Sequence, residues 1–240
     1  MKFAALLAFS SLLVGCAGFQ PPPPSDTYVA PTFSKPQQGS VIVVLPPQAQ
    51  FPEFSDGQDV VEEELIRLLV EAGYKVQRLV REDFAVAWKE EVLAVGGVFD
   101  AATGQRIPGR YDEALGRLAR RIVNDPTNTI VLASRLVLRP ATLYGASAQW
   151  DGQTRSPRSA QNTGLPVMWS GTTKGLSLEL TAVAPDGQRL FTTYGGLALP
   201  YRTDIARSEM ELRSDTFAHH IEISEGTTVA LRALLTGRAN

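Results

Sequence analysis

The chain of 240 residues contains a single cysteine, Cys16, and this limits how its fold can be held together. One cysteine allows no disulfide within the chain, so a folded domain must depend on a buried apolar core. The composition supports such a core, because 44% of the residues are hydrophobic and 20% are charged. The formal net charge is −2, whereas nucleic-acid-binding domains typically carry an excess of basic residues. We therefore expect a globular domain with no nucleic-acid partner.

Cys16 also ends a segment with the pattern of a secretory signal. Lys2 gives a short basic start, residues 3–14 form an apolar stretch, and the small residue Gly15 precedes the cysteine. A membrane-spanning helix needs roughly 20 apolar residues, which is longer than this stretch. The sequence therefore predicts a signal peptide over residues 1–15 and no transmembrane helix.

The segment Leu13-Val14-Gly15-Cys16 resembles the lipobox of bacterial lipoproteins. The resemblance implies cleavage after Gly15 and attachment of fatty acyl chains such as palmitate to Cys16, which would then hold the mature protein on a lipid bilayer. Ala17, in place of an aspartate after the cysteine, implies sorting to the outer membrane, with the domain facing the periplasm. The alternative is a plain signal peptide followed by an unmodified cysteine.

Residues 16–40 are expected to form a proline-rich tether. Pro21 to Pro24 stand in a row, and Pro31 and Pro36 follow among serine, threonine, glutamine and glycine. Proline disfavours helix and sheet, so the segment should be extended. At roughly 3.1 Å per residue, about 24 residues would reach ~75 Å. We expect a single domain to follow over residues 41–240.

This domain is predicted to be an α/β (α+β) fold, with a mixed sheet flanked by helices. The run from Val41 to Leu45 is apolar and β-branched and stops at Pro46, as in a buried central strand. Residues 60–72 place their apolar side chains on one helical face, with Asp59 as the expected N-cap. Further helices are expected over residues 83–95, 111–122 and 228–235, the last a short C-terminal helix, and further strands over 74–80 and 129–138.

Residues 176–194 predict a β-hairpin in the C-terminal half, because alternate positions are apolar up to a turn and again after it. Pro185-Asp186-Gly187 fits a three-residue turn. This turn would place Leu180 opposite Thr192. A two-residue turn would instead put Phe191 on the leucine face.

Small and polar residues over 145–170 predict a long mobile loop. Loops of this length are often functional, so we expect a partner or ligand surface there. Four of its side chains are the candidates: Trp150, Arg155, Arg158 and Trp169. The two tryptophans either fold back onto the core or stand exposed as binding residues.

The sequence shows no convincing catalytic or metal site. His219 and His220 are the only histidines, and neither Ser147 nor Ser170 lies in the Gly-x-Ser-x-Gly context of a hydrolase nucleophile. Adjacent histidines point in different directions and no free cysteine remains after acylation, which leaves too few ligands for zinc. We expect no enzyme, no metal and no cofactor, and a hydrolase is the least favoured alternative.

Four segments resemble the α/β domain of curli-export lipoproteins, of outer-membrane activators of peptidoglycan synthases, and of the N-terminal part of the Tol-system propeller protein. They are Val41–Pro46, Leu65–Val76, Thr129–Leu138 and Leu176–Leu190. The resemblance covers about half of the mature chain and implies a fold that many functions share. It transfers no binding residue. Residues 84–122 predict amphipathic helices in place of the pore segments of the curli exporter, and the ~75 Å tether is shorter than the synthase activators need.

Two functions from different classes follow as expectations. The first is a non-catalytic interaction or assembly module in the cell envelope, held by Cys16 and bound to an envelope protein. The second is a lipoprotein that binds a small molecule or a glycan under residues 145–170.

Overall fold

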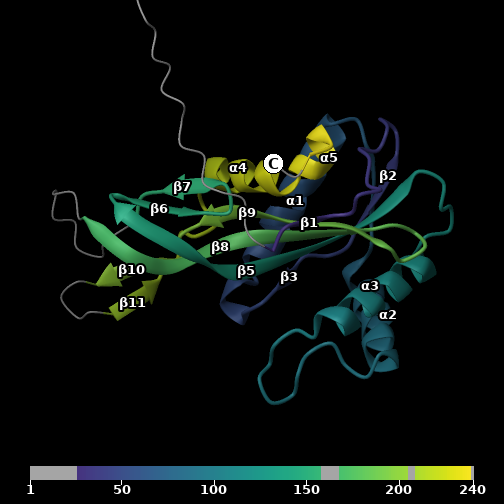
Figure 1. The fold of residues 1–240 in the computed structure, drawn as a ribbon, viewed down its shortest axis with the longest axis horizontal. Coiled ribbons are helices and arrows are strands. Elements are labelled where there is room, and N and C mark those ends of the chain that lie inside the picture. The colour runs from purple at the N-terminus through teal and green to yellow at the C-terminus, as the bar shows by residue number, and fades with distance from the viewer. Residues whose placement is uncertain (1–25, 158–167, 205–208, 239–240) are drawn as a thin grey trace, which may run out of the picture.

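The computed structural model describes residues 26–157, 168–204 and 209–238 (Figure 1). The signal peptide, Cys16 and Arg158 lie outside these residues. Within them, no helix is long and apolar enough to cross a membrane. The elements in chain order are β1 (Tyr28–Val29), β2 (Val41–Val44), β3 (Gln48–Ala49), the 3-10 helix η1 (Pro52–Phe54), α1 (Gly57–Glu71), β4 (Lys75–Arg78), α2 (Arg81–Ala94), α3 (Pro108–Ile122), β5 (Thr129–Gly145), β6 (Ser147–Trp150), β7 (Gln153–Arg155), β8 (Trp169–Val183), β9 (Arg189–Ala198), β10 (Tyr201–Asp204), β11 (Glu209–Leu212), α4 (His220–Ala230) and α5 (Arg232–Thr236).

A mixed sheet organises the domain, in the strand order β1-β9-β8-β5-β2-β4. β2 is parallel to both β4 and β5, whereas β5, β8, β9 and β1 each run antiparallel to the next. β2 is a central strand, and its Ile42 and Val44 are completely buried, as the apolar run predicts. This combination of a mixed sheet with flanking helices, a hairpin in the C-terminal half and a short C-terminal helix confirms the predicted α/β fold class.

Helices cover both faces of the sheet (Figure 1). On one face, Leu65 and Leu69 of α1 and Leu234 of α5 join a large apolar cluster over β5, β8 and β9. On the other face, Leu115 and Leu118 of α3 join a second cluster near β2. The residues expected in one C-terminal helix belong to two, because α4 ends at Ala230 and α5 begins two residues later.

α1 begins earlier than the sequence predicts. Its first residue is Gly57, so Asp59 lies inside the first turn and is not the N-cap. The Asp59 carboxylate accepts a hydrogen bond of 2.6 Å from Arg81, at the start of α2. An acidic residue in the first turn still interacts favourably with the positive end of the helix dipole. The expected apolar face is present, with Val61, Leu65 and Leu69 completely buried.

β6 and β7 occupy much of the described part of the expected loop over residues 145–170, and the long ribbon of β5 and β8 reaches its two ends. The pairing of β5 with β8 extends as far as Gly145 opposite Trp169. β6 folds back on β5, β7 pairs with β6, and Asp151 O accepts a hydrogen bond of 3.1 Å from Gly196 N of β9. The loop prediction is therefore wrong for the described residues. These strands consist of small and polar residues with little apolar alternation, and backbone hydrogen bonds hold them together, so the sequence pattern does not reveal them. Residues 158–167 lie outside the described part.

The β8–β9 hairpin has the predicted turn but a different pairing. The main chain closes around Pro185–Gly187 as expected. A one-residue irregularity next to the turn then shifts the register, so that Leu180 lies opposite Thr193 and not Thr192. The shift places Phe191 in the large apolar cluster, where it is fully buried. Burial of such a side chain stabilises a fold by about 2–3 kcal/mol, which favours the shifted register.

The folded part begins well before residue 41. β1 pairs with the edge of β9, and Ala30 is only 3% exposed. The ring of Phe33 packs edge-on against Phe191, with the centroids 5.3 Å apart. Residues 26–37 therefore lie on the domain, contrary to the expected tether over 16–40, and we call them the strap. Their pairing with β9 connects positions more than 150 residues apart, which no local pattern reveals.

Candidate binding surface

An open groove of about 710 Å³ lies across the β5–β8 ribbon. Its floor is the ribbon, one wall is the segment between β3 and η1, and the other wall is the small β10–β11 sheet. We call it the distal groove, and its residues are Gln50, Phe51, Leu138, Arg139, Pro140, Thr172, Thr173, Lys174, Tyr201 and Met210. A volume of this size suits a small molecule or a few side chains of a partner protein.

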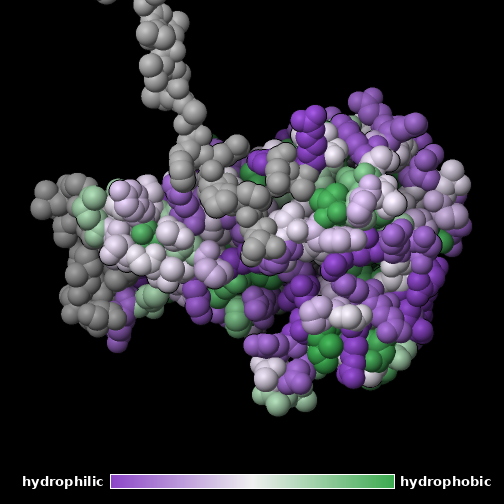
Figure 2. Space-filling view, in the orientation of Figure 1, coloured by the Kyte–Doolittle hydropathy of each residue, from purple (hydrophilic) through white to green (hydrophobic). Residues whose placement is uncertain are grey.

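Two apolar side chains on the walls of the distal groove are exposed to solvent. Phe51 is 37% exposed and Met210 is 54% exposed. Met210 belongs to β11, which pairs only with β10 in the part of the chain that the structure describes. A two-stranded sheet is marginally stable by itself, so this wall depends on its contacts with the body of the domain. At the end of the molecule that carries β10 and β11, on the left in Figure 1, residues of intermediate hydropathy (pale) are frequent, whereas hydrophilic residues (purple) dominate over the helices on the right (Figure 2).

The groove also contains a small number of polar groups. Lys174 is exposed and forms no ion pair with another described residue. The amide oxygen of Gln50 accepts a hydrogen bond of 3.1 Å from Leu138 N, which fixes the wall to the floor. Burial, together with the nearby charge of Glu53, raises the pKa of the Tyr201 hydroxyl, which therefore stays neutral at physiological pH. A mainly apolar groove with an exposed lysine that has no acidic partner among the described residues suits a ligand or peptide with an acidic group.

Arg139 connects the distal groove with a buried polar network. Its Nη1 and Nη2 donate hydrogen bonds of 2.8 Å to the two carboxylate oxygens of Asp26. Its Nε lies 2.6 Å from Asp151 Oδ2, and its guanidinium stacks 3.9 Å from the ring centre of Tyr194. Asp151 in turn accepts a hydrogen bond of 2.6 Å from Ser177 Oγ. Arg139 thereby ties the strap, the β6–β7 turn and the central strands together.

The two carboxylates that face Arg139 differ in their environment. Burial would raise the pKa of Asp26, but the hydrogen bonds and the charge of Arg139 outweigh it, so this pKa lies below its ordinary value. Burial dominates at Asp151 and raises its pKa, although Ser177 and Arg139 oppose the change. The side chain of Asp151 is 4% exposed and that of Asp26 is 49% exposed, which explains the contrast.

Trp150, one of the predicted surface residues, is buried. It is 4% exposed, and its Nε1 donates a hydrogen bond of 3.0 Å to Ser177 Oγ. Its indole covers Gly175 and Gly196, where a Cβ on Gly196 would come within 2.8 Å of the ring. Only glycine at these two positions lets the large ring lie flat on the strands, so Trp150 belongs to the core of this end of the domain.

The other predicted surface residues do not form one site either. Arg155 pairs with Glu225 of α4 at 2.9 Å, and its side chain is only 12% exposed. Trp169 is partly exposed at the end of the ribbon, opposite Gly145. Arg158 lies outside the described residues. Neither Trp150 nor Trp169 lines the distal groove, so this groove is not the cleft that the sequence predicts beneath residues 145–170.

Sequence reasoning missed the groove residues Phe51, Tyr201 and Met210. The only local signal was the alternation over residues 209–212, where Met210 and Leu212 alternate with glutamates as in a strand. Its partner strand could not be recognised, because β10 has no comparable apolar pattern. The walls of the groove come from segments more than 140 residues apart, so their meeting is a property of the tertiary structure.

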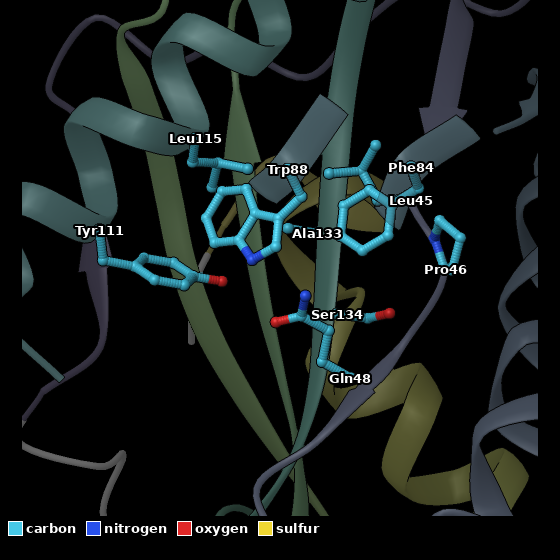
Figure 3. A pocket seen from close by; sticks show the side chains of 9 residues that line it. All are labelled: Leu45, Pro46, Gln48, Phe84, Trp88, Tyr111, Leu115, Ala133 and Ser134. Carbon is cyan, nitrogen blue, oxygen red and sulfur yellow. The ribbon is translucent and has the colours of Figure 1, made fainter. Parts of the chain in front are cut away.

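A second hollow, at the carboxyl end of β2, is too small to bind a ligand. It has a volume of about 10 Å³, enough for one water at most. Trp88 lies between Phe84 and Tyr111, with the Gln48 amide beside the indole (Figure 3). Burial is the main cause that raises the pKa of Tyr111 to about 12, so the hydroxyl stays neutral. We regard this region as packed core.

The histidines and serines that the sequence analysis weighed for a hydrolase lie on different elements of the fold. His219 Nε2 lies 3.2 Å from Asp215 Oδ2, just before α4 begins. Ser147 and Ser170 both pair with Tyr144, at the end of the β5–β8 ribbon. Within the described ranges, no three residues among histidine, cysteine, aspartate and glutamate are grouped as metal ligands.

No family model matches this chain, and no curated protein matches it. Among solved structures, two crystal forms of a PelC dodecamer from Paraburkholderia phytofirmans, one of them a point variant, have a distantly similar chain. Each is 11% identical to this chain, with a TM-score of 0.37. The alignment with the point variant covers 85% of this chain and 95% of the PelC chain, and the alignment with the other crystal form covers 87% and 94%. Similarity at this level assigns the chain to no family.

Proposed function

We propose that this protein is a lipid-anchored lipoprotein of the bacterial cell envelope that acts as a non-catalytic interaction or assembly module. The acylated residue is Cys16, and the domain faces the periplasm from the outer membrane. The observation that carries the interaction role is the distal groove, with Phe51 and Met210 exposed on its two walls. Exposed apolar side chains around a concave surface are typical of protein-binding sites.

The proposed occupant of the groove is a segment of another envelope protein that presents aliphatic side chains and a carboxylate. The aliphatic groups would cover Phe51 and Met210 and remove their surface from water, which is favourable by about 25 cal/mol per Å² of apolar area. The carboxylate would lie opposite Lys174, the cation in the groove that has no acidic partner in the described chain. An apolar contact area with a charged rim is the usual composition of such interfaces.

Photo-crosslinking in intact cells tests this proposal. A photoreactive residue replaces Met210, and the same residue replaces Val86 of α2 as a control of similar exposure, 59% against 54%. We expect an adduct with one envelope protein from position 210, none from position 86, and loss of the adduct when Lys174→Glu is added. Equal adducts from both positions, or no effect of Lys174→Glu, would contradict docking in the groove.

A second candidate function is binding of a small molecule in the same groove. Its volume of about 710 Å³ lies within the roughly 300–1,000 Å³ of ligand sites, which supports this alternative. Native mass spectrometry of the protein purified from membranes separates the two functions. A bound mass of a few hundred daltons that disappears with Met210→Glu would favour the small molecule.

A further inference from the structure

The strap is fastened to the domain along its whole length. Ala30 N donates a hydrogen bond of 2.8 Å to Leu190 O, continuing the pairing of β1 with β9. Lys35 Nζ donates a hydrogen bond of 2.6 Å to Leu235 O, in the last turn of α5. Phe33 lies between these points and packs on Phe191. The strap therefore contacts both the edge of the sheet and the C-terminal helix.

Asp26 is the first described residue, and its carboxylate pairs with Arg139 of β5. Its two hydrogen bonds to Arg139 fix the position at which the chain enters the domain. Arg139 also lines the distal groove. The entry point of the chain and the groove thus share one side chain and lie next to each other.

The chain between Cys16 and Asp26 is short. Nine residues, 17–25, separate them. Ten virtual bonds of roughly 3.5 Å each give a largest possible reach of about 35 Å, whatever conformation the segment adopts. The tether expected from the sequence, ending at residue 40, would have reached about 75 Å.

We propose that the strap is a permanent part of the domain, so that the lipid on Cys16 holds the distal groove close to the bilayer and the partner in the groove is a membrane-bound protein. This inference rests on the acylation of Cys16 in the proposed function. A partner that stays far from the membrane is out of reach, because Asp26 lies within about 35 Å of the anchor. The groove shares Arg139 with Asp26, so this part of the groove lies close to the start of the strap.

Two matched insertions test whether the strap stays fastened. A flexible insertion of fifteen glycine and serine residues is placed before Asp26 in one variant and between Gln37 and Gln38 in the other. The first lengthens the segment between Cys16 and Asp26, and the r.m.s. span of a flexible chain of that length rises from about 17 Å to about 27 Å. The second lengthens only a loop on the domain if the strap is fastened. Thermal melts of both variants check that the domain is folded.

The readout is energy transfer between the domain and labelled lipids. The acylated protein is purified from membranes and placed in vesicles with an acceptor lipid, and a donor dye is attached at Thr228→Cys, an exposed position on α4. We expect transfer to fall with the insertion before Asp26 and to match the parent protein with the insertion after Gln37. An equal fall with both insertions would overturn the fastened strap.

The outcomes separate this inference from the proposed function. If neither the parent nor the variants attach to vesicles, the lipid anchor fails. If all attach but the second insertion lowers transfer, the anchor stands and the strap proposal fails. The protein crosslinked from position 210 in intact cells must also be membrane-bound. Crosslinking to a soluble periplasmic protein, to a second copy of this chain or to a lipid would overturn the proposed partner.

Discussion

Asp26 and Arg139 are 113 positions apart in the chain and form a bidentate ion pair, in which Nη1 and Nη2 of the arginine each lie 2.8 Å from a carboxylate oxygen. The pair joins the start of the strap to the middle of the long β5 strand. Because Arg139 also contacts Asp151 and Tyr194, the pair is one end of a buried network. The stability of the N-terminal entry point and that of the ribbon are therefore linked.

Removal of Arg139 should destabilise the domain more than removal of Asp26. Arg139→Ala leaves Asp151 as a buried carboxylate without a cation, and we expect a loss of about 3 kcal/mol in the free energy of unfolding. Asp26→Ala removes a half-exposed partner, and the expected loss is below about 1 kcal/mol. Urea denaturation of the two variants measures the difference. Similar losses would show that the network does not depend on Arg139 as described.

The contribution of Asp26 should depend on pH in a defined direction. Its pKa is lowered in the fold, so its stabilising effect is complete above the unfolded pKa and is lost as the pH falls through the folded value, below about 3.8. We expect the stability difference between the parent and Asp26→Asn to be constant from about pH 5 to 8 and to shrink below about pH 4. Denaturation at a series of pH values measures it. A difference that grows on acidification would refute this assignment.

The close contact of Trp150 with Gly175 predicts a compensating pair of substitutions. Gly175→Ala places a methyl group against the indole and should destabilise the domain by about 1–3 kcal/mol. In the background of Trp150→Ala the same change should be nearly neutral, since its three nearest atoms all belong to that ring. Gly109→Ala, which meets no atom within 4 Å, is the control. Equal losses in both backgrounds would place the strain elsewhere.

Substitutions in the distal groove should weaken binding much more than folding. Met210→Glu changes a side chain that is more than half exposed, so we expect the free energy of unfolding to change by less than about 0.5 kcal/mol. Phe51→Ser removes a ring that is 37% exposed and should cost about 1 kcal/mol, which leaves the domain folded. Each should reduce the yield of the adduct from a photoreactive residue at Tyr201 by at least about tenfold, which corresponds to ~1.4 kcal/mol of binding free energy. Val86→Glu on α2 should leave the yield unchanged. Unchanged yields with both groove variants would exclude this surface.

The membrane attachment depends on one residue. Cys16→Ser should abolish metabolic labelling with fatty acids and release the domain into the soluble periplasmic fraction. Ala17→Ser, beside it, should keep both the label and the membrane association. Fractionation of cells that express each variant decides the question, and continued membrane association of Cys16→Ser would refute the lipid anchor.

Local patterns in the sequence were enough to predict the elements at the centre of the fold. The apolar run at Val41, the helical face around Leu65 and the alternation around Leu178 each reflect burial on one or two faces, which the order of residues reveals directly. The α/β class followed from these elements. The turn at Pro185–Gly187 followed from its residue types alone.

The sequence by itself therefore determined the fold class, the main helices and strands, and the expectation of an acylated Cys16. The tertiary structure decided the register that buries Phe191, the strands of residues 145–155, the strap and the distal groove. These features depend on backbone hydrogen bonds and on contacts between distant segments, such as the ion pair of Asp26 with Arg139. Such contacts leave no periodic pattern in the chain, because each partner is chosen by the shape of the folded domain and not by its neighbours in sequence.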